Sequence, residues 1–218
     1  MIKRVTLKKQ AYDYLLSAII EEKIKPLEVY SEQYFADFLE ISRTPIREAV
    51  LQLLQEGFLQ IHPNKGFSVR PISSKELTDL FELRCAVEGY CAMYAAEKYK
   101  TIEGEQLIKR LKYLAEAEQK SCEEGEDALT LMEKDTQFHG AIIDFTENNQ
   151  FKTIMKNLRA KIRMIGMRSL YREGRKADTI TEHKEILKAI SNGDKMGAYY
   201  AVKNHFDACQ NIIIGDRN

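Results

Sequence analysis

The stretch Ser42–Gly57, SRTPIREAVLQLLQEG, carries the pattern of one short amphipathic helix. Ser42 or Thr44 can cap its start, and Pro45 lies in the first turn, where a missing backbone N–H costs little. Gly57 suits the left-handed conformation just beyond a helix end. Apolar residues recur at helical spacing and form one stripe, made of Ile46, Ala49, Val50, Leu53 and Leu54. The stretch therefore predicts a helix that packs along one side only.

Two arginines lie near the start of this helix. Arg43 and Arg47 are four positions apart, so their side chains leave the same side of the helix. Two guanidinium groups in such a place can contact guanine edges and phosphates. In an arbitrary helix, a pair of solvated surface arginines would be the more common interpretation. The segments on either side favour DNA binding instead.

Two further helices are predicted ahead of this one. Residues 7–23 place apolar side chains at helical period, and Ser31 can cap a second helix over residues 32–39. Three aromatic residues of the second helix are expected to face the core: Tyr34, Phe35 and Phe38. Only residues 40–41 then connect it to the arginine-bearing helix. Two short helices joined by so small a turn are typical of a helix-turn-helix, whose second helix enters the major groove of DNA.

After Gly57 the apolar period changes from helical to alternating. Residues 58–61 and 67–70 are expected to be strands, and residues 62–66 to be the turn between them. Lys65 and Gly66 lie at the tip, where a glycine lets the backbone approach a minor groove or a phosphate. A solvated loop is the alternative interpretation of Lys65. Three helices and this two-stranded wing make a winged helix-turn-helix, which we assign to residues 1–70.

The rest of the chain is predicted to be all-helical. Residues 71–74 form a short linker, and residues 75–218 form the second domain. Breaks at Thr101, Gly125, Asn148-Asn149, Gly174 and Asn192-Gly193 separate the expected helices, which cover residues 74–99, 102–122, 127–147, 151–173, 179–191 and 194–213. Such helices with short connections favour an antiparallel bundle. The fold class is therefore mainly α, a winged helix followed by a helical bundle.

Composition leaves few other classes open. The 218 residues carry 33 basic and 33 acidic side chains, so any DNA affinity must come from local placement of charge. The four cysteines show no C-x-x-C pair and are expected to be reduced thiols. No apolar run approaches the roughly 18 residues of a membrane span, and no secretory signal is evident. We expect a cytoplasmic protein with no membrane partner.

Three of the four histidines fall in the second domain, beside a suitably placed aspartate. Asp135 and His139 are four positions apart and share one helical face, as a chelating pair must. His183 and His205 lie about 14 Å and about 17 Å from the Asn192-Gly193 turn, at about 1.5 Å per residue. An antiparallel hairpin would bring these two rings to a similar height. Three imidazoles and one carboxylate suit Zn²⁺, Ni²⁺ or Mn²⁺, although helical histidines more often pack or cap.

Residues 7–70 resemble the DNA-binding domain of the GntR family of bacterial transcription regulators. The resemblance is carried by Ser-Arg-Thr-Pro-Ile-Arg-Glu-Ala at 42–49, by Glu-Gly before the wing, and by Lys-Gly-Phe in the wing. It implies that Arg43 and Arg47 read bases. It also implies phosphate contacts from Thr44 and Ser31, and entry of Gly66 into the minor groove. The expected DNA-binding residues are Ser31, Gln33, Ser42, Arg43, Thr44, Arg47, Lys65 and Gly66.

Two positions depart from the family pattern. Gln33 stands where many members carry arginine, so one contact to a base or phosphate differs from theirs. Leu27 replaces the usual glycine of a Pro-Gly turn, so that turn is expected to differ locally.

Residues 75–213 resemble the FCD ligand-binding domain of the FadR-like branch of that family. The matching pieces are Glu82-Leu83-Arg84 with Glu88, Asp135-x-x-x-His139, Glu182-His183, Ala189-Ile190 with Gly193-Asp194, and His205. Many FCD domains bind a divalent metal through one aspartate and three histidines, and the resemblance implies the set Asp135, His139, His183 and His205 here. It also implies that Arg84 lines an effector cavity. A surface salt bridge between Arg84 and Glu88 is the alternative.

The sequence thus predicts a homodimeric transcriptional regulator that binds double-stranded operator DNA. The resemblance implies that a small carboxylate effector binds at the metal and modulates DNA binding. One alternative is a metal-free sensor of acidic ligands, in which the histidines only form hydrogen bonds. A second is a metalloenzyme with three histidines and one aspartate, but no carboxylate is clearly spaced as its general base and H-E-x-x-H is absent.

Overall fold

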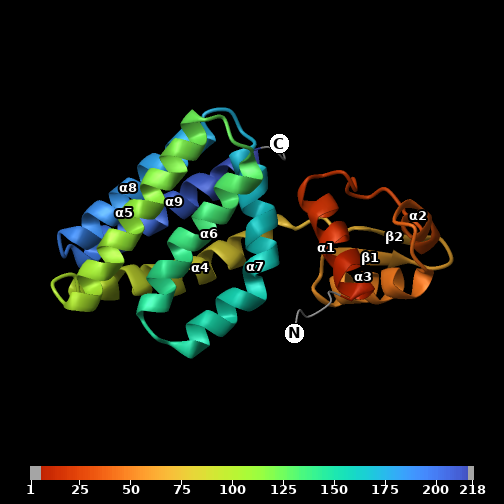
Figure 1. The fold of residues 1–218 in the computed structure, drawn as a ribbon, viewed down its shortest axis with the longest axis horizontal. Helices are drawn as coiled ribbons and strands as arrows, with labels where there is room; N and C mark the ends of the chain where they lie inside the picture. Colours follow the sequence, from red (N-terminus) through yellow and green to blue (C-terminus); the bar gives the residue numbers. More distant parts are fainter. Residues whose placement is uncertain (1–5, 216–218) are drawn as a thin grey trace. The chain divides into compact units, whose positions relative to one another are not determined.

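The computed structural model describes residues 6–215, which contain nine helices and one two-stranded antiparallel sheet (Figure 1). The chain divides into two compact units, the first ending at Ile72 and the second beginning at Ser73. The expected fold class, a winged helix-turn-helix followed by a helical bundle, is confirmed. Within the described residues, no helix is both long and apolar enough to cross a lipid bilayer.

The first unit holds three helices and the wing. Helix α1 covers Leu7–Ile20, α2 covers Glu32–Phe38 and α3 covers Arg43–Gln55, followed by strands β1 (Leu59–His62) and β2 (Gly66–Val69). Helices α1 and α3 pack against each other through a core that includes Leu15, Ile19, Ile46 and Leu53. In the sheet, Leu59 pairs with Val69 and Ile61 with Phe67. These elements form the predicted three helices and wing in the predicted order.

Helix α2 presents fewer aromatic rings to the core than expected. Phe35 is buried, but Tyr34 and Phe38 are 54% and 58% exposed, so the expectation that all three face inward is wrong. The helix has only seven residues, and its narrow buried face is filled by Phe35 and Ala36. Tyr34 and Phe38 lie on another side of the helix, where their rings stack 6.4 Å apart.

Leu27 occupies the turn position where the family pattern has a glycine. Its φ is +67°, so the backbone adopts the left-handed conformation that a glycine would favour. The side chain is 66% exposed and therefore gains little burial in return. Backbone pairing holds the turn nevertheless, because residue Pro26 bridges to Val69 and Tyr30 to Phe67. The turn keeps a glycine-type conformation without the glycine.

The second unit is an all-helical bundle. Its helices are α4 (Ser74–Glu97), α5 (Ile102–Glu123), α6 (Ala128–Phe145), α7 (Asn149–Leu170), α8 (Arg175–Ser191) and α9 (Lys195–Gly215). Side chains of Ser73, Thr101, Asp127 and Asn148 accept hydrogen bonds at the starts of the first four, which explains where these helices begin. Helix α9 packs against α4 and α8, and α5 packs against α6 and α8. The facing sides of α4, α5, α6, α8 and α9 enclose the cluster described next.

Candidate metal centre and DNA-binding groove

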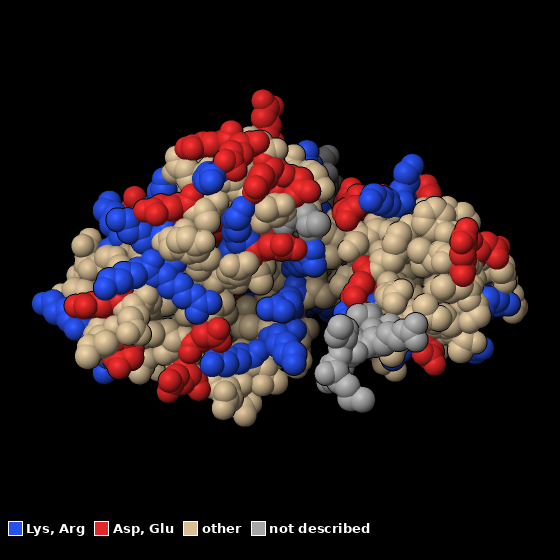
Figure 2. Space-filling model, viewed as in Figure 1, with Lys and Arg blue, Asp and Glu red and all other residues tan. Residues whose placement is uncertain are grey.

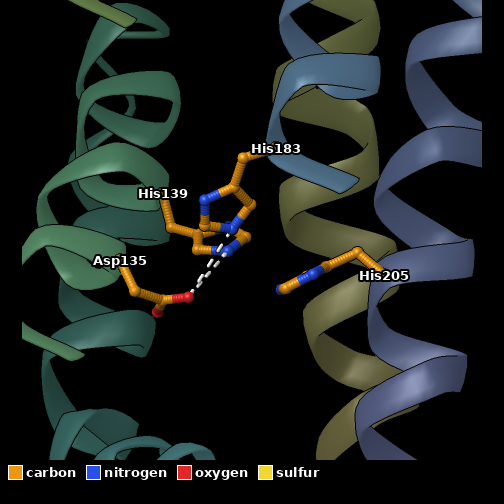
Figure 3. Close-up of side chains that lie close together, drawn as sticks. All are labelled: Asp135, His139, His183 and His205. Carbon is orange, nitrogen blue, oxygen red and sulfur yellow. Dashed lines mark ion pairs between the residues drawn. The ribbon is translucent and has the colours of Figure 1, made fainter. Parts of the chain in front are cut away.

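Helices α6, α8 and α9 bring the four expected metal ligands together (Figure 3). Asp135 and His139 project from successive turns of α6, and His183 and His205 reach toward them from α8 and α9. All four residues are buried. One ligand atom from each residue can be chosen so that all four lie within 4.8 Å of one another. The short α8–α9 turn brings the rings of His183 and His205 to a similar height, with their centres 4.8 Å apart, as their similar spacing from that turn predicts.

The separations suit one divalent ion. Asp135 Oδ1 lies 3.5 Å from His183 Nε2 and 3.9 Å from His139 Nε2. Ligands at about 2.0–2.2 Å from one ion lie roughly 3–4 Å from one another. The Nε2 atoms of His139 and His183 are buried and have no hydrogen-bond partner among residues 6–215. Two buried nitrogens left without partners beside a carboxylate are the arrangement that a metal would complete.

A carboxylate lies against the other nitrogen of each ring. Glu118 Oε2 is 2.8 Å from His183 Nδ1, and Glu182 Oε2 is 2.7 Å from His205 Nδ1. Glu88 Oε2 is 2.7 Å from His139 Nδ1. Such a partner keeps the proton on Nδ1 and leaves Nε2 free to bind a metal. All three rings are therefore held as metal ligands usually are.

Two buried arginines hold two of these carboxylates in turn. The Arg84 Nε–H donates to Glu88 Oε1 at 2.7 Å, and the guanidinium of Arg175 donates to both carboxylate oxygens of Glu182 at 2.6 and 2.7 Å. Burial raises the pKa of Glu88, but the charges of Arg84 and His139 outweigh it and hold this pKa at about 2. Each chain of contacts thus runs from an arginine through a glutamate to a histidine.

The pKa values of the two histidines from α8 and α9 shift in opposite directions. Burial lowers the pKa of His205, and the neighbouring His183 and His139 lower it further. Burial also lowers the pKa of His183, but the adjacent Glu118 and then Asp135 raise it overall. The surroundings therefore favour a positive charge at His183 and oppose protonation of His205. A metal ion bound at the cluster would take the place of any proton on the ligating nitrogens.

A cavity of about 160 Å³ opens from this cluster. Its lining includes the buried residues Arg84, Asp135 and His139 and several half-buried or exposed residues of α7. Arg84 does pair with Glu88, as the alternative expected, but the two residues are only 7% and 2% exposed, so the pair is buried and is not a surface salt bridge. The guanidinium carbon of Arg84 also lies 3.9 Å from the centre of the Phe206 ring, which fixes its direction.

The sequence interpretation missed Glu118 and Arg175. Glu118 is fully buried, and it continues the spacing of the apolar stripe of α5, which consists of Leu107, Leu111 and Leu114. A carboxylate in an apolar stripe was the available signal, since such a group needs a buried partner. Arg175 follows Gly174 in a charged stretch, and nothing in its local pattern distinguishes it. Besides Glu182 on its own helix, Arg175 contacts Ser169 of α7 and Cys209 of α9, and only the fold brings these two residues close.

Six of the eight expected DNA-binding residues line one groove of the first unit. This groove, of about 550 Å³, lies between the start of α2, the exposed side of α3 and the wing. Its lining includes Ser31, Gln33, Arg43, Arg47, Lys65 and Gly66. Ser42 and Thr44 are exposed at the start of α3 but lie outside this lining.

Several groups in the groove are held in place by neighbours. Arg43 Nη2 lies 3.3 Å from Glu32 Oε2, and Gln33 donates to Asp37 at 2.6 Å. The Ser31 hydroxyl accepts the Tyr34 backbone N–H and so caps α2. Arg47 makes no ion pair with any described residue, so its guanidinium is available to a ligand.

Gly66 has a structural reason to be glycine. Its φ is +129°, and a Cβ atom at this position would lie 2.0 Å from the backbone oxygen of Tyr30. Its neighbour Phe67 exchanges backbone hydrogen bonds with Tyr30, at 2.8 and 2.9 Å. These contacts hold the wing against the segment before α2. They account for the glycine at position 66 independently of any role in DNA binding.

The two units match two known sequence families. Residues 7–69 match the bacterial regulatory proteins of the gntR family, and residues 79–208 match the FCD domain. The Nta operon transcriptional regulator of Aminobacter aminovorans is 28% identical over 193 residues, which are 88% of this chain and 89% of that protein. The gluconate operon transcriptional repressor of Bacillus subtilis is 25% identical over 208 residues, which are 93% of this chain and 83% of that protein.

Solved structures agree on the fold. The structure of E. coli McbR/YncC superposes with a TM-score of 0.75 at 22% identity, over 99% of this chain and all of that one. The similar proteins of assigned function are transcriptional regulators and not enzymes, so the metalloenzyme alternative is wrong. This chain belongs to the GntR family and is a DNA-binding transcriptional regulator with an FCD domain.

Proposed function

We propose that this regulator senses a small organic acid at a divalent metal held by Asp135, His139, His183 and His205. The observation that carries the proposal is the convergence of these four buried side chains, with a carboxylate against Nδ1 of each histidine. Nitrogen and oxygen ligands of this kind suit Zn²⁺, Ni²⁺ or Mn²⁺. Bound there, the metal would supply Lewis acidity for an acidic ligand.

The cavity gives the proposed effector its place. A carboxylate in it can lie near both the metal ligands and the guanidinium of Arg84, because Arg84, Asp135 and His139 line the same cavity. Arginine suits carboxylates because its donors match their two oxygens. Since one donor of Arg84 is engaged by Glu88, the remaining donors are the ones a ligand would use.

We further propose that a homodimer binds pseudo-palindromic operator DNA through the grooves that Arg43 and Arg47 line. In this assignment the arginines read base edges, and Ser31, Thr44 and Lys65 contact the backbone. The Bacillus subtilis relative is named a repressor, which supports repression by the DNA-bound form. The protein would act in the cytoplasm, where the DNA is. The effector can act only through unequal affinity for the DNA-competent and incompetent arrangements.

The test measures DNA binding with and without metal. The full chain enriches its preferred duplex from a random library, and the Kd for that duplex is measured by fluorescence anisotropy. Chelator-treated protein and protein reloaded with Zn²⁺, Ni²⁺ or Mn²⁺ are each tested with a panel of small carboxylates. We expect at least one acid to change the Kd about fivefold or more, in the metal-loaded protein alone.

Asp135→Asn provides the matched variant, since it removes the ligand charge and keeps the side-chain shape. It should lose the response to acid while keeping affinity for the duplex. An equal response in chelator-treated protein would favour the metal-free acid sensor instead. No response to any acid in either form would contradict the proposal.

A further inference from the structure

The effector cavity has a second lining of cations that the metal centre does not use. Helix α7 contributes Lys152, Lys156 and Arg159 to the cavity, and Lys156 and Arg159 are exposed, whereas Asp135 and His139 are buried. The helix carries six basic and no acidic side chains between Asn149 and Leu170. Figure 2 shows blue side chains gathered over the region where α7 runs in Figure 1. This concentration of charge is local, since the whole chain is neutral.

Most charges of the cavity lining are already paired. Glu88 is held by Arg84, and Lys152 Nζ lies 3.5 Å from Asp144 Oδ1. Asp135 points toward the histidines. Lys156 and Arg159 remain, and neither makes an ion pair with a residue in the described part of the chain. These two side chains are three positions apart on α7 and are therefore neighbours on its surface.

The lining of the cavity also includes apolar side chains. Ile143, Met155 and Ile162 belong to its lining. The lining therefore combines a buried cation, Arg84, with two exposed cations, Lys156 and Arg159, and with apolar side chains.

We propose that the effector carries two anionic groups, as a small dicarboxylate does. The first group lies at the metal centre beside Arg84, and the second lies between Lys156 and Arg159. This inference rests on the proposed function, because the first group needs the metal centre. It adds the class of acid. In this proposal Lys156 and Arg159 bind the second anionic group and so make the site prefer acids with two charges over acids with one.

The test compares two acids of matched skeleton on the full, metal-loaded chain. Malate and 2-hydroxybutyrate differ in that a second carboxylate replaces a methyl group. Isothermal titration calorimetry gives the Kd of each acid. We expect malate to bind about tenfold more tightly than 2-hydroxybutyrate, as two partly exposed ion pairs can provide.

The double variant Lys156→Gln with Arg159→Gln should reduce this malate preference to about twofold or less. Lys161→Gln is the matched control, because Lys161 has the same charge on the same helix but is not part of the cavity lining. It should keep the preference. Metal content measured on every variant excludes an indirect effect through the metal centre.

The outcomes separate this inference from the proposed function. Equal, metal-dependent binding of both acids would overturn the two-anion inference and leave metal-dependent acid sensing intact. A malate preference that survives in the double variant would overturn the assignment to Lys156 and Arg159. Binding of neither acid by metal-loaded protein would count against both proposals.

Discussion

Glu118 and His183 are 65 residues apart in the sequence, yet Glu118 Oε2 lies 2.8 Å from His183 Nδ1 with both side chains fully buried. The contact joins α5 to α8 and points the opposite ring nitrogen at Asp135. Phe138 stacks on the same imidazole with ring centres 4.3 Å apart, so the ring has little freedom to turn. These contacts would hold the imidazole of His183 in one orientation before the proposed metal binds.

Glu118→Gln should weaken metal binding about 10-fold to 100-fold, since the partner of a ligating histidine sets its orientation and basicity. The amide keeps a hydrogen-bond acceptor but removes the charge. Competition with a chromogenic chelator measures the Kd. Glu116→Gln on the exposed side of α5 is the control and should leave it unchanged. Equal affinity in both variants would refute a supporting role for Glu118.

Arg175→Met should destabilise the second unit by about 3 kcal/mol, because the charge of Glu182 would lose its bidentate partner inside the bundle. Arg175 is only 2% exposed, so water cannot replace it fully. Urea unfolding followed by circular dichroism measures the loss. The exposed Arg110 provides a control, Arg110→Met, expected to cost less than about 0.5 kcal/mol. Similar losses in both variants would contradict this account of Arg175.

Leu27→Gly should stabilise the first unit by about 0.5–1 kcal/mol. A left-handed leucine costs about 1–2 kcal/mol, and glycine removes this cost. Glycine also has greater freedom in the unfolded chain, which offsets part of the gain. Thermal unfolding measures the change in Tm. Leu27→Ala is the control, since alanine keeps the Cβ atom that causes the strain. A Tm that rises equally in both variants would show that the exposed side chain, and not the backbone, matters.

Arg47→Ala should cost about 1–3 kcal/mol of specific DNA binding and relax the preference at one base position. The reason is that Arg47 lines the groove on α3 and has no ion-pair partner among the described residues. Anisotropy titrations against the enriched duplex and against single-base variants measure this. Lys25→Ala, at an exposed position of the same unit outside the groove, should change little. Unchanged affinity in the Arg47 variant would remove α3 from its role as recognition helix.

Most of the fold follows from local sequence signals. Ser31, Thr101 and Asn148 cap helices where the pattern predicts, and Gly57, Gly125 and Gly193 have positive φ at helix ends. These features depend on neighbours within four residues, so a sequence can reveal them. The prediction that Tyr34 and Phe38 face the core is wrong because aromatic character alone does not determine which side of a short helix is buried.

The same distinction between local and tertiary information applies to the candidate metal site. The proximity of Asp135 and His139 was predictable because a single helix sets their spacing, and the α8–α9 turn sets that of His183 and His205. Glu118 and the cations of α7 reach the site from helices that only tertiary packing brings close. No local period contains that information. The contacts that orient the ligands therefore had to come from the structure.

Metal content tests the central proposal most directly. Full-length protein purified without chelator is analysed by elemental mass spectrometry beside His183→Ala and His62→Ala, the latter altering the one histidine outside the cluster. We expect about one divalent metal per chain in the unaltered and His62→Ala proteins, and a loss of most of it in His183→Ala. Metal-free protein in all three cases, even after incubation with Zn²⁺, Ni²⁺ and Mn²⁺, would contradict metal-dependent sensing.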